Sequence, residues 1–224
     1  MADKMLKPSP ELMERVRQAF LDHGYAGLSM VDLAKVCGFT RRSLYNYFSN
    51  KEEAFKASIT YENAGHVRRG LEAGERVRHE GGSALDIFSE IMDVRYGFTR
   101  RLLNQSPHTV ELNAEVFKRC RDSMIASAIE FQEALAKLLV DLEKDGLLRL
   151  TREIHPYRAA QMLADGGRAV NQSMPPPASK DLAGRYRDMC QAILYGCAVP
   201  VKTGRRVPPK ASPKTAAKSP AKWH

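Results

Sequence analysis

Long hydrophobic runs are missing from this chain of 224 residues. No stretch approaches the roughly 18 apolar residues that a membrane-spanning helix needs, and the opening residues, MADKMLKPSP, lack the apolar centre of a signal peptide. We therefore expect a cytoplasmic protein with no membrane partner. Strand-like alternation of apolar and polar residues is also missing over any useful length, so the sequence predicts an all-α fold.

Cysteine is scarce, and no two cysteines form a C-x-x-C motif. The four are scattered along the chain, which favours buried, reduced thiols over disulfides or a zinc site: Cys37, Cys120, Cys190 and Cys197. The chain also lacks a Gly-rich phosphate loop, a metal-spaced His and Cys cluster, and G-x-S-x-G. We expect no enzyme activity, metal or cofactor, although an active site assembled from distant residues would leave no such motif.

Acidic residues are absent from residues 201–224. This stretch holds seven cations, which supply most of the formal net charge of +9: Lys202, Arg205, Arg206, Lys210, Lys214, Lys218 and Lys222. A basic tail over 200–224, rich in Lys, Pro, Ala and Ser, cannot bury enough apolar surface to fold, so we expect disorder. Its charge favours either salt-sensitive, sequence-independent affinity for DNA or a purely solubilising role.

The stretch from Ser29 to Phe48, SMVDLAKVCGFTRRSLYNYF, has the pattern of two short helices joined by a glycine turn. Ser29 and Asp32 have the spacing of a capping box, Gly38 suits the end of the first helix, and Thr40 can cap the second. The apolar residues of the first helix recur at helical spacing on one face: Met30, Leu33, Ala34 and Cys37.

The second of these helices separates apolar from polar side chains. Leu44 and Phe48 would point inward, while the outer face carries Arg41, Arg42, Ser43 and Tyr45. This layout is typical of a DNA-binding helix-turn-helix, whose second helix enters the major groove. Each of these polar side chains therefore has a DNA-contacting interpretation.

Guanidinium groups bind guanine edges in a bidentate manner, so Arg41 and Arg42 are candidate base contacts. The alternative is a solvated charged face. Ser43 is small enough to touch a base or a thymine methyl. Tyr45 and Tyr47 carry hydroxyls suited to phosphate oxygens, although Tyr45 has a second interpretation as a core residue.

At these residues the chain resembles a known family. Gly24-Tyr25 followed by SMVDLAKVCGFTRRSLYNYFSNKEEAF is similar to the N-terminal signature of the tetracycline-repressor (TetR) family of bacterial transcriptional regulators, over roughly Leu6 to Phe55. The resemblance implies that four residues hold the DNA backbone and fix the register without specifying the sequence: Ser29, Thr40, Tyr47 and Lys51.

Three residues depart from the family pattern. Cys37 stands where alanine is usual, Phe39 where valine is usual, and Arg42 where glycine or another small residue is usual. The first two keep their burial. Arg42 adds a long cation to the outer face, so no relative's target sequence can be carried over.

The remaining chain keeps helical periodicity. We expect a first helix from Pro10, capped by Ser9 and ended by Gly24, and a fourth capped by Asn50. Glycines at 65, 70 and 74 would fray or bend that helix, because each weakens it by up to about 1 kcal/mol. Later expected boundaries are a start at Ser83, a break at 104–107, one long helix from Glu111 to Asp145, a start at His155-Pro156 and a last helix capped by Ser179.

These elements suggest four segments. They are a flexible arm (1–9), a helix-turn-helix DNA-binding domain (10–57), a helical effector-binding and dimerisation domain (58–199) and the disordered basic tail (200–224). The last two helices combine apolar residues with small ones, which would let a second subunit approach closely: Ala159, Ala160, Gly166 and Gly167. The resemblance also implies a dimer through these helices. The alternative is an intrachain core.

The middle helices would form an effector chamber. Its candidate lining is Phe88, Met92, Tyr96, Phe117, Cys120 and Met124, with His108 or Arg95 as the polar contact. Methionine-rich surfaces repack readily and suit apolar effectors, but such a stripe is equally typical of an ordinary core.

The sequence thus predicts a homodimeric transcriptional regulator that binds a palindromic double-stranded operator, mainly as a repressor, and is released by a small-molecule effector. A two-fold dimer places its reading helices about 34 Å apart or further, which matches a palindrome. The alternatives are an architectural DNA-binding protein that relies on the basic tail, a redox-responsive regulator acting through Cys120 or Cys190, and, less favoured, an enzyme.

Overall fold

The computed structural model describes residues 5–199, and the structural statements below concern these residues. Their regular elements are helices apart from two short strands, which confirms the predicted fold class. The elements are α1 (Pro10–His23), α2 (Met30–Val36), α3 (Arg41–Tyr45), α4 (Lys51–His79), α5 (Ala84–Met92), the π-helical turn η1 (Asp93–Gly97), α6 (Phe98–Leu103), α7 (Thr109–Arg119), α8 (Arg121–Lys144), α9 (Pro156–Asn171), the 3-10 turn η2 (Ser179–Asp181) and α10 (Leu182–Cys197).

Two short strands were not predicted. β1 (Arg149–Leu150) and β2 (Ala198–Val199) pair antiparallel, with Leu150 opposite Ala198. Strands of this length contain no alternation that a sequence could reveal. The predicted basic tail lies outside the residues that the structure describes.

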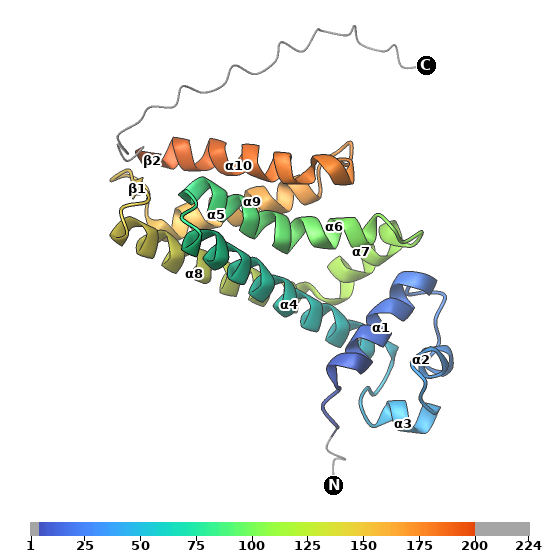
Figure 1. Ribbon diagram of the computed structural model, residues 1–224. Helices are drawn as coiled ribbons and strands as arrows, with labels where there is room; N and C mark the ends of the chain where they lie inside the picture. The colour runs from blue at the N-terminus through green and yellow to red at the C-terminus, as the bar shows by residue number, and fades with distance from the viewer. Residues whose placement is uncertain (1–4, 200–224) are drawn as a thin grey trace, which may run out of the picture.

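The helices form a small head and a larger body (Figure 1). α1, α2 and α3 make the head at the beginning of α4, and α4 leads from it into the body. There α10 packs on α9 and α5, and α9 packs on α8. No helix within 5–199 is both long enough and apolar enough to cross a membrane.

Helix starts follow the predicted capping residues. At the start of each of the first four helices, a side-chain oxygen accepts the backbone N–H three residues ahead: Ser9, Ser29, Thr40 and Asn50. The capping box of Ser29 and Asp32 is complete. Gly38, with a φ of 74°, makes the left-handed turn after α2 that a side chain would strain.

The expected helix from Glu111 to Asp145 is in fact two helices, α7 and α8, which are interrupted at Cys120. The reason is that the two parts serve different cores. Leu112 and Cys120 are buried with the head, whereas Phe131 and Leu142 are buried in the body. A straight helix could not serve both.

The expected cap of the last helix is also wrong. Ser179 begins η2, and α10 starts only at Leu182 without a side-chain cap. The Ser179 hydroxyl instead accepts a hydrogen bond of 3.4 Å from the amide of Asn104.

The glycines of α4 do not fray it, because the helix continues to His79. They let neighbouring elements approach. A Cβ at Gly74 would lie 2.5 Å from the Ile91 side chain, and one at Gly70 would lie 3.1 Å from the Cβ of Arg95. α5 and η1 therefore pack directly against the α4 backbone.

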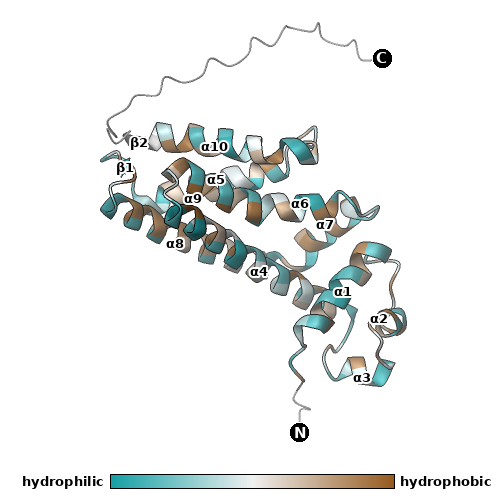
Figure 2. Ribbon diagram, in the orientation of Figure 1, coloured by the Kyte–Doolittle hydropathy of each residue, from teal (hydrophilic) through white to brown (hydrophobic). Residues whose placement is uncertain are grey.

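Two hydrophobic cores result, one in the head and one in the body. The head core contains Val16, Phe20, Leu33, Leu44 and Phe55 together with residues of α7. The body core is built from α5, α8, α9 and α10. Figure 2 shows hydrophobic and hydrophilic stretches alternating along helices such as α8, as expected for amphipathic helices that face a core on one side.

The small residues of α9 fill space within the chain. A Cβ at Gly167 would lie 2.7 Å from the Tyr96 ring, and one at Gly166 would lie 2.6 Å from the sulfur of Met189. Ala159 and Ala160 are buried in the body core. The alternative interpretation of these four residues, as intrachain packing, therefore describes what the structure shows.

Candidate nucleic-acid interface

α3 presents its two arginines to solvent. Arg41 and Arg42 are exposed, while Leu44 on the opposite face is buried in the head core. The Arg41 guanidinium carbon lies 5.5 Å from the centre of the Tyr45 ring, which is partly exposed. A cation held over an aromatic ring in this way loses part of its conformational freedom without losing its hydrogen-bond donors.

The angle of α3 is set by the turn that precedes it. Arg15 on α1 donates from Nη1 to the Cys37 carbonyl at 3.0 Å, and the Phe39 N–H donates to the Ala34 carbonyl at 2.8 Å. Arg15 thus ties α1 to the end of α2. Sequence reasoning missed this residue, since nothing local to an exposed arginine reveals a partner 22 positions away.

Three of the predicted contact residues also hold the helix together. Thr40 Oγ1 accepts the Ser43 N–H at 3.1 Å and lies 2.8 Å from Ser43 Oγ, so the two hydroxyls share a hydrogen bond. Tyr47 is half-buried and packs edge-to-face on Phe39, with ring centres 5.8 Å apart. The phenylalanine that departs from the family pattern therefore orients a predicted phosphate-contacting tyrosine.

Lys51 has partners within the protein. Its Nζ donates to the carbonyls of Tyr25 at 2.8 Å and Leu28 at 2.7 Å, and it lies 4.3 Å from the centre of the Tyr25 ring. Two of the three ammonium donors therefore fasten the start of α4 to the loop before α2. One donor is left for a phosphate, and the predicted DNA role of Lys51 stays a prediction.

The N-terminal segment runs beside α3. The Leu6 N–H donates to the Asn46 carbonyl at 2.8 Å, and Lys7 is exposed next to it. Part of the expected flexible arm is thus hydrogen-bonded to the end of the candidate reading helix, and residues 1–4 lie outside the described range.

The head is joined to α7 by specific contacts. Ser106 donates to the Leu21 carbonyl at 2.6 Å, and Glu111 Oε1 accepts the Ala26 N–H at 2.6 Å. Arg119 extends this contact. Its guanidinium carbon lies 4.4 Å from the Tyr25 ring centre and pairs with Glu52 and Glu115.

The predicted effector lining is not one surface in this structure. Phe88, Met92 and Tyr96 belong to the body core, while Cys120 and Met124 belong to the head core. α7 and the first turn of α8 pack with the head, whereas the rest of α8 packs in the body, so the candidates are divided between two cores. Of the other candidates, Phe117 is 60% exposed, and the half-buried His108 lies 3.5 Å from Glu111.

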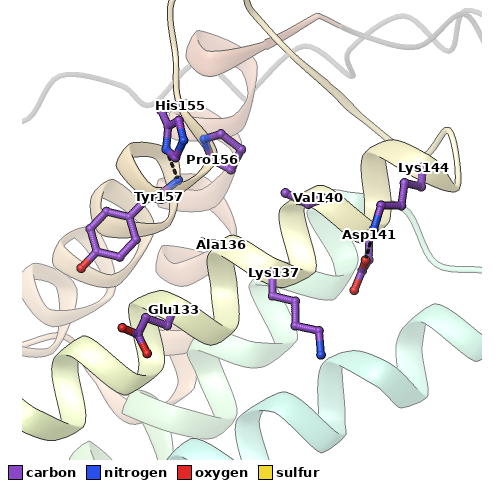
Figure 3. A pocket seen from close by; sticks show the side chains of 9 residues that line it. All are labelled: Glu133, Ala136, Lys137, Val140, Asp141, Lys144, His155, Pro156 and Tyr157. Atoms are coloured by element: carbon purple, nitrogen blue, oxygen red, sulfur yellow. Dashed lines mark hydrogen bonds and ion pairs between the residues drawn. The ribbon is translucent and has the colours of Figure 1, made fainter.

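A surface groove lies elsewhere, between α8 and the start of α9 (Figure 3). Its volume is about 490 Å³, and its lining consists of Glu133, Ala136, Lys137, Val140, Asp141, Lys144, His155, Pro156 and Tyr157. Several of its polar groups already bind one another. His155 Nδ1 accepts the Tyr157 N–H at 3.2 Å, and Lys144 pairs with Asp141 at 3.0 Å.

The thiols are poorly suited to a redox switch. Burial raises the pKa of Cys120 to about 11 and that of Cys190 to about 12, so almost no reactive thiolate forms near neutral pH. The redox alternative therefore finds no support in the geometry. Within 5–199, His, Cys, Asp and Glu side chains form no group of three that could hold a metal ion.

Comparison with known proteins agrees with the geometry of the head. Residues 12–57 match the family model described as "Bacterial regulatory proteins, tetR family". The HTH-type transcriptional regulator TtgR of Pseudomonas putida is 26% identical over 181 residues, which cover 78% of this chain and 83% of that protein.

Solved structures share the arrangement of both head and body. A TetR transcription regulator from Haloarcula marismortui has a TM-score of 0.65 at 14% identity, covering 84% of this chain and 97% of that one. SmeT, described as the repressor of the Stenotrophomonas maltophilia multidrug efflux pump SmeDEF, has a TM-score of 0.60 at 17% identity, covering 92% and 100%. These structures share the fold, while the match of residues 12–57 and the similarity to TtgR support a DNA-binding transcriptional regulator of the TetR family.

Proposed function

We propose that this regulator is a homodimeric repressor that binds a palindromic operator and leaves it when a small-molecule effector binds the body. The exposure of Arg41 and Arg42 on a helix whose opposite face is buried carries the proposal. A rigid, positively charged helix of this kind fits the major groove and can form bidentate bonds to guanine. The description of SmeT as a repressor supports the direction of regulation.

The proposed contacts divide into two groups. Arg41, Arg42 and Ser43 read base edges. The remaining residues position the helix on the DNA backbone: Ser29, Thr40, Tyr45, Tyr47 and Lys51. We take residues 10–57 as the DNA-binding domain and 58–199 as the effector-binding and dimerisation domain, although α7 of the second domain completes the core of the head.

A dimer through α9 and α10 supplies the second head. TetR-family regulators act as dimers, and the outer side of α10 offers small and apolar residues that this chain does not cover. A Cβ added at Gly184 or Gly196 would meet no atom within 4 Å, and Tyr195 is exposed. Two heads related by a two-fold axis read two half-sites about 34 Å apart or further.

The effector acts on the spacing of the heads. If it binds better to a state with wrongly spaced heads, DNA and effector weaken each other reciprocally, and tenfold relief needs about 1.4 kcal/mol of coupling. α4 and α7 are the connecting elements. α4 runs from the head into the body, and α7 holds the head through Glu111 and Ser106.

An Arg42→Ala variant tests the proposal. The operator is first selected from random DNA with the wild-type protein, and affinities are then measured at fixed salt for the operator and for single-base variants. Arg42→Ala should lose about 1–3 kcal/mol of discrimination at one position in each half-site. Arg68→Ala is the matched control, because Arg68 is an exposed arginine on α4.

Two outcomes would contradict the proposal. One is unchanged discrimination in Arg41→Ala, Arg42→Ala and the double variant. The other is loss of all binding when residues 201–224 are deleted, which is the result expected of an architectural protein that relies on its tail. In our proposal, the deletion weakens binding to every sequence alike and leaves selectivity intact.

A further inference from the structure

Arg95 is a buried charge that forms no salt bridge with any of the described residues. It lies in η1 and is only 7% exposed, and its Nε has no hydrogen-bond partner. Among residues 5–199 it is the only Arg, Lys, Asp or Glu that is buried. Burying a charge without a partner is costly, so its retention in a core requires a reason.

The surroundings of Arg95 are aromatic. Its guanidinium carbon lies 4.8 Å from the centre of the Tyr96 ring and 4.7 Å from that of Phe131 on α8. On the α4 side it packs against Gly70, which has no side chain to interfere. Ring faces attract a cation but accept none of its hydrogen bonds in the way an oxyanion does. The Tyr96 hydroxyl donates to the Ala164 carbonyl at 3.2 Å, and its oxygen can still accept a hydrogen bond from Arg95, but this group is neutral and supplies no counter-charge.

Two more buried polar atoms without partners lie on the same helix faces. Ser127 Oγ is one turn before Phe131 on α8, and His66 Nε2 is one turn before Gly70 on α4. Residues four apart share a helix face, so both lie on faces that pack around Arg95. The His66 Nε2 is 3.3 Å from Glu62 Oε2 but lacks the geometry of a hydrogen bond.

The charge of this group indicates the ligand class. His66 is neutral near pH 7, because burial first, and the nearby positive charges second, lower its pKa to about 3. Among the positive charges near His66, Arg95 is the only buried one, and its single charge in an apolar setting matches one negative charge better than two. A carboxylate has that charge, and its two oxygens fit the planar guanidinium.

We propose that Arg95, with Ser127 and His66 beside it, binds the carboxylate of an apolar monocarboxylic acid and that such an acid is the effector. This inference rests on the proposed function for its regulatory meaning. The acid replaces the missing counter-charge, and its apolar part lies against the aromatic residues. Arg95 packs on α4 at Gly70. A carboxylate that binds the guanidinium and shifts it therefore acts directly on the helix that leads to the head.

Paired ligands test this inference without any mutation. The full-length protein, free of DNA, is titrated by calorimetry with straight-chain acids from butanoate to dodecanoate and with phenylacetate, each beside its primary amide. At least one acid should bind with a dissociation constant at or below millimolar and at least about tenfold more tightly than its amide, since an ionic partner is lost in the amide. Inorganic phosphate, the dianion control, should not compete.

An Arg95→Met variant gives the second readout. It should abolish the preference for acid over amide and leave the melting temperature of the free protein unchanged or higher, because it removes an unpaired buried charge. Arg68→Met, at an exposed site on α4, should keep the preference. If Arg95→Met does not fold, Arg95→Lys replaces it and should weaken acid binding without affecting the amides, since lysine lacks the planar fork.

The inference is overturned if no acid in the series binds more tightly than its amide, or if the preference survives in the folded Arg95 variant. These results leave operator binding untouched, because no DNA is present. Conversely, a protein that prefers acids but selects no operator would contradict the proposed function while supporting the site.

Discussion

The surroundings of His66 determine its protonation state. It is buried on α4, its Nδ1 lies 2.9 Å from the Thr99 hydroxyl, and its ring packs edge-to-face on Phe98 at 5.4 Å. The charged and titratable groups around it are Glu62 and Arg69 on α4, Arg17 on α1 and Arg95 on η1. Burial and the three arginines keep the ring neutral, so acid should destabilise the fold at this residue.

The expected pH dependence has a definite sign. Between pH 6.5 and about 3 the unfolded chain binds a proton at His66 that the folded chain does not, so stability is lost as the pH falls. From pH 7 to pH 5 the loss should reach up to about 2 kcal/mol at this residue. Urea unfolding of wild type and His66→Gln at both pH values measures it, and the variant should lose less stability.

The variant comparison is needed because Glu62 acts in the opposite direction. Burial raises the pKa of Glu62, so the folded chain takes up a proton there first and gains stability as the pH falls. His79→Gln is the control, since His79 is exposed near the end of the same helix. An equal acid-induced loss in wild type and His66→Gln would contradict the prediction.

At the scale of elements, α7 is the joint between head and body. Leu112 is buried in the core of the head although α7 lies about fifty residues beyond the predicted DNA-binding domain, which ends at residue 57. The hydrogen bonds from Ala26 to Glu111 and from Ser106 to Leu21 hold the same two parts together. The head is therefore not closed by residues 10–57 alone, and its orientation depends on α7.

Leu112→Ala should accordingly destabilise the head. Removing a buried leucine leaves a cavity and typically costs about 2–5 kcal/mol, so we expect a loss of that size in chemical unfolding. Operator affinity should fall as well, because α3 loses part of its support. Val110→Ala on the same helix is the control, since Val110 is 84% exposed. Equal stability of the two variants would show that α7 contributes nothing to the head.

At the scale of the whole molecule, the proposed function requires two heads. The α3 helix contains only five residues, from Arg41 to Tyr45, and one such helix contacts a few base pairs. Useful selectivity therefore depends on a partner subunit that doubles the reading surface and raises the effective concentration of the second head.

Tyr195→Glu should disrupt the assembly without unfolding the subunit. Tyr195 is 58% exposed on α10, so a buried charge would arise only in the proposed dimer interface. We expect monomers in sedimentation equilibrium and a loss of operator affinity of about 10²–10⁴-fold. Tyr61→Glu, at a 44% exposed site on α4, should remain dimeric. A Tyr195→Glu protein that stays dimeric would place the interface elsewhere.

The sequence by itself determined the local features of this protein. The caps at Ser29, Thr40 and Asn50, the turn at Gly38 and the outward face of α3 all depend on residues within a few positions of one another. Such short-range hydrogen bonds and periodicities depend only on residues that are close together in the sequence, and for this reason the helix-turn-helix could be predicted in detail.

Only the tertiary structure decided how these pieces support one another. The hydrogen bonds from Arg15 to Cys37 and from Lys51 to the loop before α2 join residues more than twenty positions apart. The predicted helix is interrupted at Cys120 because its two parts contribute to two different hydrophobic cores. The isolation of Arg95 is likewise a property of the packed body. A charge is unpaired only with respect to neighbours in space, and the order of residues does not specify those neighbours.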